Sequence, residues 1–158
     1  KSGKYIVPDK EDDIRKILYT RRDRKKWGKG FVRGIGADVG GVASTVAHET
    51  HGLILLGWDD ADMLLAANTA LKIGGGIVFA DKGRIIYSLP LPNGAIMSSL
   101  PVKKLAEELK KGNSILKKRG SILDDPIWTI CFLTFTSIVE LRITSSGVYD
   151  VKRGSIVF

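Results

Sequence analysis

At 158 residues, with 44% hydrophobic and 27% charged residues, the chain has the size and composition of one ordinary globular domain. Its apolar runs are too short to cross a bilayer, and no signal peptide opens it, which argues against a membrane protein. The single cysteine, Cys131, excludes an internal disulfide and favours a cytoplasmic location.

The net charge of +8 is concentrated at the start of the chain, because residues 1–30 carry eleven Lys or Arg and only five Asp or Glu. The densest part is RRDRKKWGK, residues 21–29. A basic run beside aromatic residues is typical of a nucleic-acid-binding surface. Such a run reads no bases by itself, so we favour a solvated hairpin loop over a nucleic-acid site.

Residues 1–16 are expected to form an N-terminal arm and connector, with residues 5–7 as an edge strand. The domain itself is expected to cover residues 17–158. Residues 17–20 and 31–36 are rich in β-forming residues on either side of the basic run. This arrangement predicts an antiparallel hairpin with the basic run as its loop.

Two uncharged stretches, residues 42–47 and 53–56, have the pattern of buried strands. Between them lies the sequence HETHG, residues 48–52, which contains both histidines of the protein. A polar loop held at the ends of buried strands is a frequent place for a binding site. We therefore predict a binding loop here.

A helix is expected next, capped by Asp59 or Asp60. Its apolar face is predicted to contain Leu64, Ala67 and Leu71, and the glycines at 74–76 end it. Residues 77–80 and 84–89 then predict a hairpin.

A second helix is expected after a cap at Ser98 or Ser99, with its apolar positions beginning at Val102 and its end at Gly120. Residues 127–135 suit a helix or a strand almost equally, and we favour a buried helix. Residues 141–144 and 148–151 predict a closing hairpin. The expected fold class is α+β: a largely antiparallel or mixed sheet with two to three helices on one side, in two layers.

Several catalytic centres are excluded by the composition. One cysteine is too few for the zinc signature of nucleobase deaminases. His48, Glu49 and His51 do not furnish the ligands of a two-metal centre, and Ser44 has no convincing partners for a triad. The two histidines and Glu49 could hold one metal ion weakly. From its residues alone, the chain is a binding or accessory domain with one polar loop of interest, and no certain catalytic residue, cofactor site or metal site is assigned to it.

Sequence blocks along the chain nevertheless form an ordered series. They include GFVRGIG at 30–36, ASTVAHETH at 43–51, GGGIV at 74–78, LPLP at 89–92 and ELRIT at 140–144. In this order they resemble the C-terminal domain of adenine deaminase, a member of the amidohydrolase superfamily. The resemblance spans about residues 17–153.

The resemblance implies hydrolysis of adenine to hypoxanthine and ammonia by metal-activated water. The Mn, Fe or Zn ions would be held by a barrel domain absent from these residues, so this chain alone is expected to be inactive. The barrel, the adenine and further copies of the chain are the expected partners. Nucleic acid and membrane are not.

Under this resemblance, the binding loop is hypothesised to lie over the mouth of the barrel as a lid on the purine. The alternative is that the histidines only shape the loop or a domain interface. The candidate lid residues are Ser44, His48, Glu49 and His51.

The chain departs from the family at three places. The family usually has Asp at Glu49, Asn at Gly52 and a Pro-containing run at residues 136–139. Loss of the Asn amide removes a hydrogen-bonding group from the loop. Two alternatives therefore stay open: a stand-alone ligand-binding or assembly domain without catalysis, and a basic module that uses residues 21–29 on nucleic acid.

Overall fold

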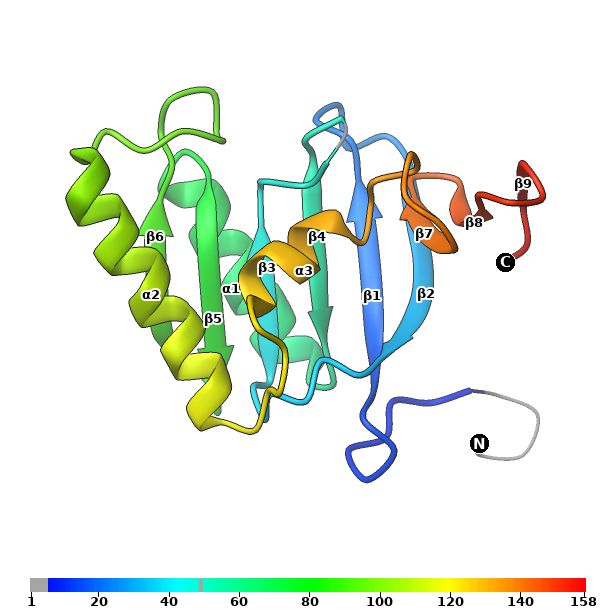
Figure 1. Ribbon diagram of the computed structural model, residues 1–158, viewed down its shortest axis with the longest axis horizontal. Helices are drawn as coiled ribbons and strands as arrows, with labels where there is room; N and C mark the ends of the chain where they lie inside the picture. The colour runs from blue at the N-terminus through cyan, green and yellow to red at the C-terminus, as the bar shows by residue number, and fades with distance from the viewer. Residues whose placement is uncertain (1–5, 49) are drawn as a thin grey trace.

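The computed structural model describes residues 6–48 and 50–158. At its centre is a six-stranded sheet in the order β2-β1-β4-β3-β5-β6, in which every neighbouring pair is antiparallel (Figure 1). Its strands are β1 (Ile14–Thr20), β2 (Trp27–Arg33), β3 (Gly41–Ser44), β4 (Leu53–Gly57), β5 (Gly76–Asp81) and β6 (Arg84–Pro90). A smaller antiparallel sheet contains β7 (Leu141–Thr144), β8 (Gly147–Asp150) and β9 (Ser155–Ile156).

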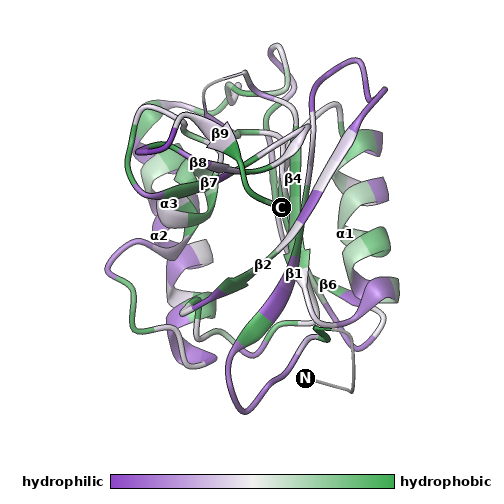
Figure 2. Ribbon diagram, turned by 90° about the vertical axis from the view of Figure 1, so that its right-hand side faces the viewer, coloured by the Kyte–Doolittle hydropathy of each residue, from purple (hydrophilic) through white to green (hydrophobic). Residues whose placement is uncertain are grey.

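Helices cover both faces of the large sheet. Helix α1 (Asp60–Lys72) lies on one face, and helices α2 (Val102–Lys118) and α3 (Pro126–Phe132) lie on the other (Figures 1 and 2). The α+β class and the antiparallel sheet are confirmed, but the expectation of two layers with helices on one side is wrong. The central strands are apolar on both faces, so each face needs its own cover.

Alternate residues of these strands supply two separate cores. On β3, Val42 packs in the core under α2 and α3, whereas Ala43 packs in the core under α1. On β5, Phe79 and Val78 divide in the same way. The period of two along each strand therefore decides which layer a side chain stabilises.

The hairpin across the basic run is confirmed and is longer than expected. Strand β1 already begins at Ile14, and its last residue, Thr20, is paired with Trp27 at the start of β2. The expected edge strand at residues 5–7 is not found at Ile6 or Val7, and Tyr5 lies outside the described residues. The hairpins β5–β6 and β7–β8 form where the sequence predicts them.

Helix α1 begins as expected, because the Asp59 side chain accepts a hydrogen bond from Asp62 N at 2.8 Å. Its buried face is narrower than predicted. It contains Met63 and three alanines, whereas Leu64 is 61% exposed and Leu71 37%. Small residues let the helix approach the sheet closely: a Cβ on Gly41 would lie 2.4 Å from Met63 N.

The two helices of the other face are confirmed, with one correction. Neither Ser98 nor Ser99 caps α2, because its N-cap residue is Pro101, which offers no capping side chain. Asp125 does cap α3, accepting from Trp128 N at 3.0 Å, so the Asp-Pro signal decides for helix here. No helix in the described ranges is long and apolar enough to cross a membrane.

Candidate functional site

The loop that carries both histidines joins β3 to β4 at the upper end of the sheet in Figure 1. We call residues 45–52 the histidine loop and this end of the sheet the histidine-loop end. The β1–β2 loop, residues 21–26, and the segment that leaves β6, residues 91–101, reach the same end. Three connections far apart in the sequence therefore meet around the predicted binding loop.

Hydroxyl groups hold the start of the histidine loop. Ser44 is buried, and its Oγ donates to Val46 O at 3.0 Å and accepts from Val46 N at 3.1 Å. Thr45 Oγ1 donates to Ala95 O at 2.6 Å and accepts from Gly76 N at 2.8 Å. Both side chains are thus engaged in shaping the turn that presents the histidines.

His48 is tied to helix α3 and to the residues that follow it. Its backbone N–H donates to Cys131 O at 3.1 Å, and Thr134 Oγ1 donates to its carbonyl. The ring stacks on Phe132, with centroids 4.8 Å apart, and on Trp128, with centroids 5.7 Å apart. His48 is therefore held in an aromatic pocket whose outer member, Trp128, is 45% exposed.

His51 meets His48 edge-on, with ring centroids 5.1 Å apart. It has a positive φ of 43°, and its backbone N–H donates to Ala47 O at 2.8 Å, which closes the loop. Arg22 Nε donates to its carbonyl at 3.0 Å. Burial, the neighbouring His48 and the Arg22 charge together lower the pKa of His51, so the neutral imidazole is favoured.

One ring nitrogen of each histidine is buried without a hydrogen-bond partner among the described residues: Nε2 of His48 and Nδ1 of His51. Buried polar atoms in folded proteins are normally paired, so an unpaired one calls for an explanation, of which a ligand-binding role is one. The two imidazoles are therefore brought together with unused hydrogen-bonding capacity. Glu49, the third predicted residue of this loop, lies outside the described residues.

The end of the loop is pressed against the neighbouring hairpin at Gly52. A Cβ at this position would lie 1.8 Å from Thr20 O, a separation that a real side chain could not keep. Gly52 thus permits a close backbone contact between the loop and β1. Tyr19 on the same strand makes a hydroxyl–hydroxyl hydrogen bond with Thr50.

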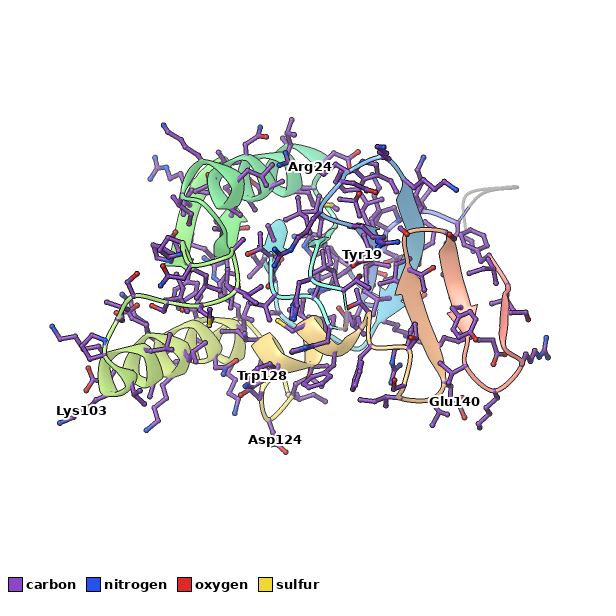
Figure 3. The ribbon with its side chains drawn as sticks, turned by 90° about the horizontal axis from the view of Figure 1, so that it is seen from above. Tyr19, Arg24, Lys103, Asp124, Trp128 and Glu140 are labelled. Carbon is purple, nitrogen blue, oxygen red and sulfur yellow. The ribbon has the colours of Figure 1, made fainter. Side chains whose placement is uncertain are left out.

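A hydroxyl-rich pocket of about 180 Å³ opens beside the histidine loop. Thr50 and Thr134 connect it to the backbone of the loop, and Tyr19 and Thr144 contribute further hydroxyl groups. Figure 3, which looks onto this end of the sheet, places Tyr19 near its middle, between Arg24 beside α1 and Trp128 on α3. Arg21 also lines this pocket, so hydroxyl groups and one guanidinium group together suit a polar ligand edge with acceptor atoms.

Metal chemistry does not fit the described residues. No group of three or more His, Cys, Asp or Glu among them is placed to hold a metal ion. His48 and His51 are close, but the His48 ring packs against Trp128, Phe132 and Phe135. Burial raises the pKa of Cys131 to about 11, which keeps this thiol protonated and neither a metal ligand nor a nucleophile.

Sequence reasoning missed the aromatic side chains around His48. Trp128 and Phe132 are four residues apart on α3, a spacing that places them on one face of a helix. That face was recognisable once the segment was taken as a helix. Its contact with a loop some eighty residues earlier was not.

Comparisons with known proteins identify the family to which the chain belongs. The family model described as the adenine deaminase C-terminal domain matches residues 1–155. Adenine deaminase from Kosmotoga olearia is 38% identical over 154 residues, which cover 96% of this chain and 27% of that protein. Adenine deaminase from Clostridium botulinum strain Langeland is 34% identical over 158 residues, which cover 99% of this chain and 26% of that protein.

A third relative, adenine deaminase from Moorella thermoacetica, is 38% identical over 149 residues, covering 93% of this chain and 25% of that protein. The chain thus spans about a quarter of the length of the curated relatives that it matches. The family model covers nearly all of its residues, and identity to these relatives exceeds 30%. The chain therefore belongs to the adenine deaminase C-terminal domain family.

Proposed function

We propose that this chain serves as the C-terminal domain of an adenine deaminase, an enzyme that hydrolyses adenine to hypoxanthine and ammonia. The observation that carries the proposal is the match of residues 1–155 to a domain of proteins named adenine deaminase. Because about three quarters of each relative lies outside the match, the groups that activate water are assigned to a separate catalytic domain.

The metal ions implied by the family, Mn, Fe or Zn, are assigned to that catalytic domain as well. The described residues of this chain lack a cluster that could hold one. Their contribution is instead to bind, orient and enclose the base. A cytoplasmic location and assembly with further copies of the chain stay predictions.

Within this function, the histidine loop is assigned the part of a lid over the purine. Support comes from the buried, unpartnered Nε2 of His48 and Nδ1 of His51. A neutral imidazole can donate to one purine ring nitrogen or accept from an exocyclic amine. Ser44, whose hydroxyl is engaged within the turn, shapes the loop rather than contacting the ligand.

The catalytic domain is expected to dock on the apolar cleft between α2, α3 and the segment that leaves β6. This cleft has a volume of about 350 Å³, and its lining is continuous with the His48 surroundings through Trp128 and Val46. Exposed apolar side chains stand along it, with Val102 at 84% and Met97 at 60%. Exposed apolar surface of this kind marks protein contacts.

The test uses the complete polypeptide that carries this domain, with adenine consumption followed as hypoxanthine and ammonia appear. His48→Ala is expected to lower kcat/KM about tenfold or more, mainly through KM, because the lid hydrogen bond to the base is lost. Asp60→Asn, an exposed change at the opposite end of the sheet, is the matched control and should leave both constants unchanged.

Two results would contradict the proposal at different levels. An unchanged kcat/KM in His48→Ala would reject the lid but leave the domain assignment standing. Absence of adenine turnover by the complete, metal-loaded polypeptide would reject the activity. The 158-residue chain by itself should turn over no adenine with Mn²⁺ or Zn²⁺ supplied, and turnover by pure material would reject a separate catalytic domain.

A further inference from the structure

A second cavity, of about 370 Å³, lies at the histidine-loop end on the α1 side of the sheet. Three arginines of the β1–β2 loop line it: Arg21, Arg22 and Arg24. Its other walls come from the histidine loop, the end of α1 and the segment that leaves β6. Figure 3 shows Arg24 beside α1, across the sheet from Trp128, so this arginine pocket is separate from the aromatic surroundings of His48.

The described residues do not balance the charge in the arginine pocket. No acidic side chain lines the pocket among the described residues, and no ion pair of the described structure involves any of the three arginines. Asp23, in the same loop, accepts instead from Lys25 N at 3.2 Å. Three like charges around one cavity repel each other, and a bound anion would relieve that repulsion.

Arg22 is held in place before any ligand arrives. Its Nε donates to His51 O at 3.0 Å, and its Nη2 donates to Gly94 O at 2.8 Å. The side chains of Arg21 and Arg24 donate no hydrogen bond within the described part of the chain, so their guanidinium groups stay available. A fixed arginine between two free ones suits an anion with several acceptor oxygens.

We propose that the arginine pocket binds the phosphoryl group of a small phosphorylated molecule. A guanidinium group can donate two parallel hydrogen bonds to two oxygens of a phosphate, and the phosphate dianion neutralises the concentrated positive charge. The volume lies at the lower end of the range of about 300–1,000 Å³ typical of small-molecule sites. Leu53, Leu71 and Pro92 provide the apolar wall against which the rest of the molecule would lie.

A nucleic-acid strand fits these observations less well. Its phosphates are spaced along a backbone and need a basic track, whereas here three arginines line one cavity beside the hairpin loop. Lys25 and Lys26 of the same loop are not part of its lining. Arginine variants should therefore affect a ligand held in the pocket, and lysine variants should not. This difference distinguishes a small phosphorylated molecule from a nucleic-acid strand.

The binding test uses the 158-residue protein with ribose 5-phosphate and inorganic phosphate as probes. Ribose is the uncharged control ligand, and the ionic strength is held constant. Ribose 5-phosphate should bind measurably and ribose should not. The double variant Arg21→Gln/Arg24→Gln should weaken binding about tenfold or more, because charge-assisted hydrogen bonds are lost. Lys25→Gln/Lys26→Gln, with the same change in charge, should weaken it less than about threefold, the effect of diffuse charge alone.

A spectroscopic signature locates the bound anion. Burial lowers the pKa of His51, and the neighbouring His48 and Arg22 lower it further. A phosphate group beside Arg22 offsets the positive charge of its guanidinium. The midpoint of the His51 imidazole titration, followed by NMR, should therefore move to higher pH when ribose 5-phosphate is added. The shift should vanish in Arg21→Gln/Arg24→Gln. Both variants change exposed side chains, and circular dichroism checks that they stay folded.

Two results would overturn the proposal. The first is equal weakening by the two double variants, which would mean general charge attraction. The second is tighter binding of a single-stranded oligonucleotide than of ribose 5-phosphate, which would assign the loop to nucleic acid. Neither result depends on adenine hydrolysis, so the proposal and the proposed function can fail separately.

Discussion

The two ends of the large sheet are built in opposite ways. At the end away from the histidine loop, buried carboxylates are fully engaged: Asp62 accepts from Lys82 N at 2.9 Å and Gly83 N at 2.8 Å. At the histidine-loop end, two buried imidazole nitrogens have no hydrogen-bond partner among the described residues, and the side chains of Arg21 and Arg24 form no ion pair within that part of the chain. The first arrangement stabilises the fold, and the second leaves groups free for a ligand.

The end of the sheet away from the histidine loop has a second hydrogen-bond network, around Asp13. Its carboxylate accepts from Gly34 N at 3.0 Å and Gly36 N at 2.8 Å, and it pairs with Arg15. The Arg15 guanidinium is almost wholly buried and lies 3.8 Å from the centroid of the Trp58 ring. Burial lowers the pKa of Arg15, and the Asp13 charge opposes that shift.

The largest expected effect on stability comes from breaking this network. Asp13→Ala leaves a buried guanidinium and two loop N–H groups without their acceptor, so the free energy of unfolding should fall by about 3 kcal/mol or more. Urea unfolding followed by Trp fluorescence measures it. Asp12→Ala is the control, because the Asp12 pair with Arg33 is exposed and should contribute less than about 1 kcal/mol. Equal losses in the two variants would contradict the network.

Asp62 should follow with a smaller loss. Asp62→Ala removes the acceptor of two turn N–H groups, which we expect to lower the free energy of unfolding by about 2 kcal/mol. Hydrogen exchange should speed up at Lys82 and Gly83 first. Retained protection of these two amides would show that the turn does not depend on the carboxylate.

The histidine-loop end should behave differently. His48→Leu keeps an apolar side chain against Phe132 and removes a buried nitrogen without a partner, so stability should stay level or rise by up to about 1 kcal/mol. In the complete polypeptide that carries this domain, the same variant should lower kcat/KM for adenine, as the proposed lid requires. If unfolding instead became easier by more than about 1 kcal/mol, His48 would be a structural residue and the contrast between the two ends would fail.

The smallest effect concerns pH. The pKa of His51 is lowered in the folded state, so the unfolded chain takes up a proton at this residue more readily. Stability from this group is therefore present above the ordinary histidine pKa of about 6.5 and is lost as pH falls through the lower folded value. His51→Gln should flatten that part of the pH profile of unfolding. An unchanged slope would assign the acid sensitivity elsewhere.

Much of this fold follows from short patterns in the sequence. The buried strands at β3 and β4, the hairpin across the basic run and the Asp caps of α1 and α3 all depend on neighbours within a few residues. The place of the histidine loop between two buried strands is local in the same sense. So is the order of the sequence blocks that indicated the family.

Only the tertiary structure shows which distant residues surround the histidines and the arginines. Trp128 and Phe132 stack around His48 from far along the chain, and Arg21 and Arg24 line one cavity together with the end of α1. The division of the helices between two faces is of the same kind. Periodicity and caps report local backbone geometry, whereas these contacts depend on how the twisted sheet brings distant loops to one end.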